Sequence, residues 1–472
     1  MKALRRWWSR ASRREREFLK NLAIGVAIAL FAGLFETNAA VGKVRDSLLT
    51  WQVAQFGSTD SGRNILWLDV DDATYRTWHT PPVTPRDRLC RLIDFAVRGK
   101  ARVVVVDVDL SNPAVPGTYP PVAPCAVGAS PSVHVKTADA ELKAYLHHYA
   151  LACRGRSWAA GCPAIVLVRD LRTSYLSNYA DGSPARTGRA AYFDDAAFSP
   201  NGPVYWSSPN FNVDDDAMIR LWRLWEPLCD PGSVLPSTEL FAGVLFAGTD
   251  PAKMRRSLEA FGSECVPVSG GLSAHATSAD LSGQATVDVG YPLQLSSRTE
   301  LRRFFYRIGW DAGADRPSMA AFVPAGLVTE ADAQHPFDEG LALNRIVVIG
   351  GSYRDNPDFH RTPLGMLPGT LILINAIDAL IRDDSVHETP LLLRVAIELT
   401  LIVAISAIFL YFSPLLATLA STLVVVVAAL TLGFVFLNAG YWIDPVLPLI
   451  GIQIHSLIAM LEHRHRPEGE AA

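Results

Sequence analysis

The sequence is poor in charged residues: only 19% of its 472 residues are Asp, Glu, Lys or Arg, and the formal net charge is −4. The lack of a positive excess argues against a nucleic-acid partner, because such a partner requires a basic face. Glycine and proline, with 33 and 31 residues, fall short of a low-complexity or collagen-like composition. With 49% hydrophobic residues, the chain also has too much apolar material for disorder over its whole length. What remains is a membrane protein with a substantial water-soluble part.

Three long segments near the C-terminus contain almost no charge. We expect transmembrane helices at residues 391–412, 415–437 and 442–461, because about 20 apolar residues are needed to cross a bilayer. The third segment is the shortest, and its entry at Tyr441-Trp442 is an aromatic pair suited to the membrane interface. The alternative is that these segments are buried helices of a soluble core. Consecutive apolar runs longer than about 18 residues make this alternative less favourable.

The N-terminal region has a basic segment followed by a shorter apolar one. We expect residues 1–20 to form a basic cytoplasmic tail and residues 21–37 to form an anchoring helix, with a cleaved signal peptide as the alternative. Gly25, Ala29 and Gly33 follow one another at a spacing of four residues, which gives this helix a small-residue face for contact with another helix. Four spans would place residues 462–472 in the cytoplasm as a second tail. Residues 38–390 would then lie outside the cytoplasm.

Cysteine is scarce, and none of it falls in the predicted transmembrane helices or tails. The six cysteines all lie within residues 38–390: Cys90, Cys125, Cys153, Cys162, Cys229 and Cys265. An even number in an oxidising compartment predicts disulfides, with 15 possible connectivities. Cys153 and Cys162 are close enough in sequence to close a local loop, and Cys229 and Cys265 bracket another segment. A zinc site is disfavoured, because no CxxC or Cys–His pair has ligand spacing.

Residues 38–390 alternate between strand and helix patterns. Apolar segments at residues 65–70, 102–106, 164–168 and 346–349 predict strands, and a helix is expected to begin at Pro85-Arg86 and to stop at Gly99. Fully apolar strands are typical of a parallel sheet covered on both faces. We therefore expect an α/β fold with a mixed, mainly parallel sheet and helices on both faces. Residues 171–212 are rich in Ser, Asn, Gly, Pro and Tyr, and we expect them to form long surface loops.

Polar side chains follow several predicted strands at the edge where parallel α/β sheets bind ligands. Asp71 and Asp107 would gather there and could hold a cation or act as acid and base. The alternative is that they cap the turns and helices that follow. His360 has no Cys, His or Ser partner at useful spacing, so a nucleophilic triad is not supported. GxSxG, P-loop, HExxH and GxGxxG motifs are absent, and we expect no metal or cofactor.

Several motifs occur in a recognisable order along the chain. They are Arg45-Asp46-Ser47-Leu48, Asp71-Asp72-Ala73-Thr74, Pro85-Arg86, Val106-Asp107, Asp214-Asp215-Asp216 with Ile219-Arg220, Val347-Val348-Ile349-Gly350, Asp358, Thr362-Pro363, Pro368-Gly369 and Asn375-Ala376. Together they resemble the CHASE2 domain, the extracellular sensory module of bacterial histidine kinases, nucleotide cyclases and serine/threonine kinases. Ala217 stands where the family's middle motif has Gly, and Leu371 and Leu373 stand where Glu and His are frequent.

The resemblance implies a multi-pass sensor of the bacterial inner (plasma) membrane, with its large domain in the periplasm or outside and an unknown extracellular ligand. The residues we assign to ligand binding are Asp71, Arg86, Asp107, Asp358 and Thr362. The sequence ends soon after the last predicted span, so we expect no kinase or cyclase output domain. The protein would then not be an enzyme and would signal through a separately encoded effector; a homo-oligomer is also allowed. A periplasmic enzyme or cell-envelope scaffold on the same α/β domain is the alternative.

Two charged residues fall inside the first C-terminal span. Arg394 and Glu398 are four residues apart, so they share one helix face and can neutralise each other. Because isolated charges in lipid are costly, the pair also predicts a contact with another helix or a partner.

Overall fold

The computed structural model describes residues 12–33, 39–56, 62–110, 113, 125, 137–156, 161–179, 184–188, 193–194, 202–214, 216–228, 234–259, 265–267, 284–296, 302–311, 313–319, 321–331, 337–383, 385–438 and 441–442. The chain forms two compact units. Residues 57–385 make an α/β unit, and residues 1–56 with 386–472 make a helical one. The predicted external domain, 38–390, extends beyond the α/β unit at both ends.

A six-stranded sheet forms the centre of the α/β unit. Its order is β17 (Phe322–Pro324), β1 (Ile65–Val70), β18 (Ile346–Gly351), β2 (Val103–Val106), β3 (Ala164–Val168) and β6 (Val204–Ser207). Each neighbouring pair runs parallel. The strands are apolar because both faces are covered, as a parallel sheet requires. The four strands predicted from the sequence are all present in this sheet.

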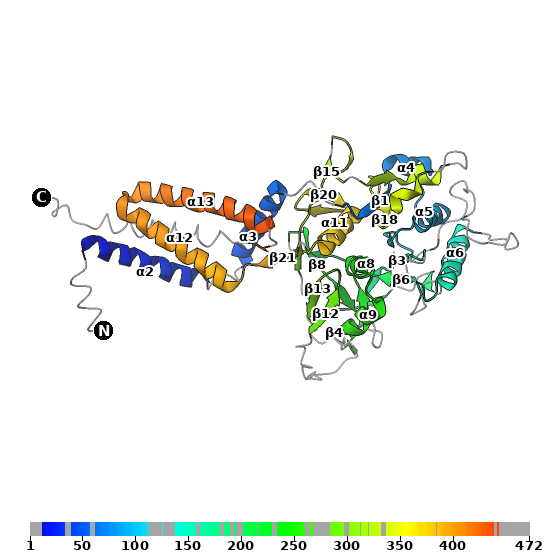
Figure 1. The fold of residues 1–472 in the computed structure, drawn as a ribbon, viewed down its shortest axis with the longest axis horizontal. Coiled ribbons are helices and arrows are strands. Elements are labelled where there is room, and N and C mark those ends of the chain that lie inside the picture. Colours follow the sequence, from blue (N-terminus) through cyan, green and yellow to red (C-terminus); the bar gives the residue numbers. More distant parts are fainter. Residues whose placement is uncertain are drawn as a thin grey trace. The chain divides into compact units, whose positions relative to one another are not determined.

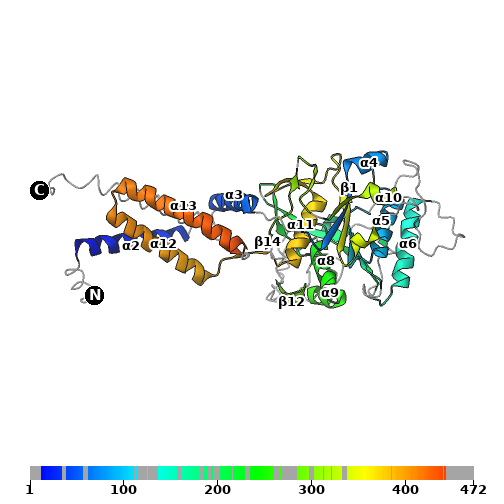
Figure 2. The same cartoon turned by 45° about the horizontal axis from the view of Figure 1, so that its top comes forward.

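Helices cover the two faces of the sheet separately (Figures 1 and 2). Leu66 and Leu68 point to one face, where they join the apolar core of α5 (Arg86–Arg98) and α6 (Ala138–Ala152). The opposite face is covered by α8 (Thr238–Ala247) and α11 (Gly369–Ile381). The predicted α/β class, with a mainly parallel sheet and helices, is confirmed.

The remaining elements surround this core. They are α4 (Asp72–Thr77), β7 (Asn212–Val213), β8 (Ile219–Trp222), β9 (Trp225–Pro227), β10 (Val234–Pro236), α9 (Pro251–Glu259), β12 (Gln284–Asp288), β13 (Pro292–Ser296), β14 (Arg302–Phe304), β15 (Trp310–Asp311), β16 (Arg316–Pro317), α10 (Ala325–Thr329), the 3₁₀ helix η2 (Glu339–Ala342), β19 (Phe359–Thr362) and β20 (Gly365–Pro368). The pairs β9–β10, β12–β13, β15–β16 and β19–β20 are antiparallel.

The prediction of long loops over residues 171–212 is wrong. β4 (Leu171–Tyr179) and β5 (Pro184–Gly188) pair as an antiparallel hairpin, and β11 (Cys265–Pro267) pairs with the other edge of β4. β6 from the same region enters the central sheet. Polar composition misled the prediction, because an antiparallel strand with one solvated face can be polar and still be a strand. Residues 180–183, 189–192 and 195–201 lie outside the described residues.

Asn375 connects α11 to the segment that follows β14. Its Oδ1 accepts hydrogen bonds from the backbone N–H groups of Arg307 and Ile308, and its Nδ2 donates to the carbonyls of Ile308 and Leu371, all at 2.9 Å. Asn375 is 1% exposed, and these four bonds account for its donors and acceptors. This residue of the closing motif therefore has a structural role.

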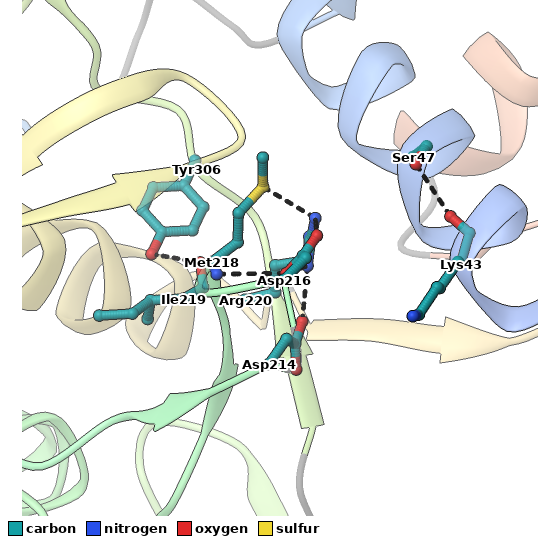
Figure 3. A network of polar contacts seen from close by, with 8 residues as sticks. All are labelled: Lys43, Ser47, Asp214, Asp216, Met218, Ile219, Arg220 and Tyr306. Carbon is teal, nitrogen blue, oxygen red and sulfur yellow. Dashed lines mark hydrogen bonds and ion pairs between the residues drawn. The ribbon is translucent and has the colours of Figure 1, made fainter. Parts of the chain in front are cut away.

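A buried arginine holds the turn between β7 and β8 (Figure 3). Nη1 of Arg220 donates to Oδ2 of Asp214 at 2.7 Å, and Nη2 donates to Oδ2 of Asp216 at 2.6 Å. The guanidinium lowers the pKa of Asp216 through these hydrogen bonds. Ala217, inside the turn, has a φ of 61°, which lies in the left-handed region that favours glycine. Alanine thus replaces the glycine typical of this motif, and its Cβ makes this backbone conformation less favourable.

The helical unit contains α2 (Arg13–Gly33), α3 (Ala39–Phe56), α12 (Leu391–Tyr411) and α13 (Pro414–Asn438). Among the residues that the structure describes, two helices are long and apolar enough to cross a membrane, at Leu392–Tyr411 and Leu415–Phe436. The side chains of α2 after Ala27 lie outside those described, so the anchor at 21–37 stays a prediction. Trp442, the first residue of the predicted fourth span, pairs in β22 (Tyr441–Trp442) with β21 (Ser385–Glu388). Residues 443–461 lie outside the described residues.

Gly25 allows a close contact between two helices of this unit. A Cβ added at Gly25 would lie 2.6 Å from Cγ2 of Ile402, so α2 and α12 pack against each other there. Gly25 is thus a helix-contact residue within the chain. The surroundings of Ala29 and Gly33, the other members of the predicted small face, lie outside the described side chains.

Two disulfides are present in the described part of the α/β unit, and one of them is the predicted local closure between Cys153 and Cys162. Cys90 pairs with Cys125, and Cys153 pairs with Cys162. All four cysteines are buried. Cys229 lies outside the described residues and the side chain of Cys265 is not described, so their pairing stays a prediction.

We predict that removal of the two disulfides has unequal costs. The bridges span sequence separations of 35 and 9 residues, so the chain-entropy relation gives about 4 kcal/mol for Cys90–Cys125 and about 3 kcal/mol for Cys153–Cys162. Each pair is replaced by serine in the full chain, and the free energy of unfolding is measured in denaturant. A larger loss for the Cys153–Cys162 pair would contradict this expectation.

We also predict that Ala217→Gly stabilises the protein by about 0.5–1 kcal/mol, because glycine adopts the observed φ without a Cβ clash. Ala217 is exposed, so little packing is lost. Ala73→Gly, in the helix α4, is the matched control and should destabilise by about 1 kcal/mol. Equal signs for the two substitutions in denaturant unfolding would disprove the argument.

Candidate functional site

A cleft of about 720 Å³ opens at the carboxyl edge of the central sheet. It is reached by the ends of β1, β2, β3 and β18, through Val70, Asp107, Val168 and Gly351. This is the edge at which open parallel α/β sheets bind ligands. The rest of its lining is Pro82, Val83, Thr84, Val108, Asp109, Asp170, Pro209, Asn210, Phe211, Val213, Ile219, Tyr353, Asn356, Asp358, His360, Gly369, Thr370, Ile372 and Leu373.

Two carboxylates lie at the first turn of α11 within this cleft. Thr370 donates from Oγ1 to Oδ2 of Asp107 at 2.7 Å. Nε2 of His360 lies 2.7 Å from Oδ1 of Asp358. The site thus joins the end of β2, the segment before β19, β19 itself and the start of α11.

Two glycines provide the space for this arrangement. A Cβ at Gly350 would collide with Oγ1 of Thr370, and a Cβ at Gly369 would collide with the carboxylate of Asp358. Gly350 therefore lets α11 approach the end of β18, and Gly369 lets Asp358 lie over the start of the helix. Both glycines belong to the closing motif of the sequence.

Burial changes the acid–base behaviour of the cleft. Desolvation, with a contribution from the nearby Asp358, raises the pKa of Asp107 to about 7, although the Thr370 hydrogen bond opposes it. The hydrogen bond to Asp358 raises the pKa of His360, and burial opposes this. Ionisable groups with shifted pKa values in a cleft are typical of functional sites.

Asp69 is a second buried carboxyl on the same face of the sheet. On one side of β18, Asp69 pairs in register with Gly350. On the other side, Val106 pairs with Ile349, so the next residue, Asp107, also lies beside Gly350. Ser352 donates a hydrogen bond to Asp69, whose pKa is raised well above its usual value by desolvation.

The structure brings together two of the five residues assigned to ligand binding, Asp107 and Asp358. Asp71 lies outside the cleft and caps α4 by accepting a hydrogen bond from the N–H of Thr74 at 2.8 Å, which is the capping alternative. Arg86 is fully buried, and its Nη2 donates to the carbonyl of Asp109 at 3.0 Å.

Thr362 is also outside the cleft. It is buried in the β19–β20 hairpin, where its Oγ1 donates to the carbonyl of Gly365 at 2.8 Å and accepts from the N–H of Leu364. Its surroundings are those of a turn-forming residue.

Sequence reasoning missed Thr370 and the partner of His360. Only Cys, His and Ser were considered as partners, so Asp358 was overlooked, although it lies only two residues before His360. Thr370 carries no local signal, because its contact with Asp107 depends on the packing of α11.

Within the described ranges, no group of three or more His, Cys, Asp or Glu side chains is arranged to hold a metal ion. Oxygen and nitrogen atoms from four protein segments nevertheless converge on the cleft. Such an arrangement can bind a small polar molecule and exchange a proton with it near neutral pH.

Comparison with known proteins gives one family. No curated protein and no solved structure matches the chain. The family model described as CHASE2 domain matches residues 22–413, which include the whole α/β unit and α12. The chain therefore belongs to the CHASE2 family of extracellular sensory domains.

Proposed function

We propose that this protein is a membrane-anchored extracytoplasmic sensor whose α/β unit binds a small external ligand in the cleft. The observation that carries the proposal is the cleft itself, in which Asp107 and Asp358 lie at the first turn of α11. A cavity of this size, with apolar walls and a few converging polar groups, is typical of a ligand site. Membership of a sensory family supports the same function.

We place the protein in the bacterial inner (plasma) membrane as a multi-pass protein, with the α/β unit in the periplasm or outside. Two apolar helices of spanning length support the anchor. The two disulfides support an oxidising compartment, because such bonds persist there.

The signal would pass through the helical unit to a separately encoded protein, or between copies of this chain. Arg394 and Glu398 on α12 form an ion pair, with Nε and Oε1 3.1 Å apart. Each side chain is 31% exposed, so the pair is available to another helix. A charged pair on an apolar helix is costly in lipid and typically marks a functional contact.

A periplasmic enzyme is the second candidate. A cell-envelope scaffold built on the same α/β unit is the non-catalytic form of this alternative. The observation that favours an enzyme is the proximity of Asp107, with its raised pKa, to Asp358, since two carboxyls in different environments can act as acid and base. We propose binding without catalysis, because the chain belongs to a family of sensory domains.

We predict that Asp107→Asn changes how stability depends on pH. The raised pKa means that the native carboxyl keeps its proton between about pH 4 and 7 while the unfolded one ionises, so rising pH favours unfolding across this window. The variant lacks this contribution. Its free energy of unfolding should therefore increase by about 1–3 kcal/mol relative to wild type as the pH rises from 5 to 8.

The free energy of unfolding of both proteins is measured across this range in denaturant. The raised pKa of His360 acts in the same direction, and Asp358, Asp109 and Asp170 also line the cleft, but all of these groups are present in both proteins. Parallel pH curves for wild type and variant would show that Asp107 titrates normally.

We predict that Glu398→Leu weakens recovery of the partner about three- to tenfold, because it breaks the ion pair on α12. Tagged full-length protein is purified from native membranes in mild detergent, and the proteins that accompany it are quantified by mass spectrometry.

Thr400→Leu is the matched control: Thr400 is an exposed polar residue of the same helix, about 200° around the axis from Glu398. It should leave recovery unchanged. Equal losses for both variants, or no partner in any preparation, would remove the proposed transfer of signal through α12.

A further inference from the structure

We propose that the cleft at the carboxyl edge of the sheet binds a small organic cation, an amine that carries an apolar group. This inference rests on the proposed function, since it names the class of ligand that the sensor would recognise. Four features of the cleft support it: its size, the sign of its charges, the occupation of the α11 N-terminus and the apolar part of its wall.

The size of the cleft suits an organic molecule. A volume of about 720 Å³ lies within the range of small-molecule sites, roughly 300–1,000 Å³, and far exceeds what one ion fills. The described residues also provide no set of three metal-binding side chains.

The charges of the cleft are of one sign. Asp107, Asp109, Asp170 and Asp358 line it, and among the described lining residues His360 is the one side chain that can become positive. His360 is already hydrogen-bonded to Asp358. An anionic ligand would therefore meet carboxylates, whereas an ammonium group would be attracted to them.

The N-terminus of α11 is not open to an anion. A helix N-terminus normally attracts anions, but here the carboxylate of Asp358 fills the space that a Cβ of Gly369 would take. Thr370 in the same turn donates to Oδ2 of Asp107. Within the described part of the chain, Oδ1 of Asp107 and Oδ2 of Asp358 accept no side-chain hydrogen bond, so each can accept from a ligand N–H.

The rest of the wall can hold an apolar group. Phe211 and Tyr353 line the cleft and offer aromatic rings, which attract organic cations as well as apolar groups. Val83, Ile219 and Leu373 add aliphatic surface. Leu373 stands where the family often has a polar residue, so this chain has an apolar wall at that position.

Three probes of one skeleton test the ligand class: phenethylamine, 2-phenylethanol and phenylacetate, which carry positive, zero and negative charge. Binding to the full-length protein in phosphatidylcholine nanodiscs is measured by isothermal calorimetry up to millimolar concentration. The amine should bind at least tenfold more tightly than the alcohol, and the anion most weakly.

Two charge-removing variants locate the binding. At about pH 8, above the raised pKa of Asp107 and below that of an aliphatic amine, Asp358→Asn and Asp107→Asn should each weaken amine binding at least fivefold while changing alcohol binding less than twofold. Asp288→Asn is the matched control, because Asp288 is exposed on β12 and does not line the cleft. It should bind the amine as wild type does.

Any of four results overturns the inference: equal binding of the three probes, tighter binding of the anion, no binding of the amine, or amine binding that both Asp358→Asn and Asp107→Asn leave unchanged. The partner-recovery experiment on α12 uses none of these probes. A wrong ligand class and a failed transfer of signal would therefore be recognised separately.

Discussion

The close approach of α11 to the end of β18 is the constraint on which the site depends. It requires glycine at position 350, because any Cβ there would occupy the place of the Thr370 hydroxyl. Thr370 then reaches Asp107 on the neighbouring strand end, and Gly369 leaves room for Asp358. Three hydrogen bonds of Asn375 hold the same helix to the segment after β14. The closing motif is therefore one packing arrangement rather than a row of separate ligand residues.

The buried carboxyls of this arrangement reduce stability. Asp69 and Asp107 both have raised pKa values because they lose water, and neither has a neighbouring cation to offset that loss among the contacts described. A packed apolar residue would be the more stable choice at such positions. Groups of this kind are usually retained where a site needs them, and both lie at the ligand edge of the sheet.

The parts of this molecule that could be predicted from sequence are those with a local signal. Continuous apolar runs identified β1, β2, β3 and β18, and a spacing of four identified the Arg394–Glu398 pair. The β4–β5 hairpin was missed, because its polar strands resemble loops until a partner strand is present. The carboxyl edge of the sheet, where the sequence predicts Asp107, borders the cleft, but Thr370 could not be found, since its role depends on how a helix packs.

The strand order has a consequence for how the protein is made. β18 lies between β1 and β2 in the sheet. β1 (residues 65–70) and β2 (residues 103–106) therefore lack the strand that joins them until residues 346–351 have been synthesised. Such distant pairing slows folding and leaves strand edges open in the meantime. The Cys90–Cys125 and Cys153–Cys162 bridges close within the earlier part of the chain and can form first. During synthesis, β1 and β2 therefore stay unpaired on this side until the last strand of the sheet has been made.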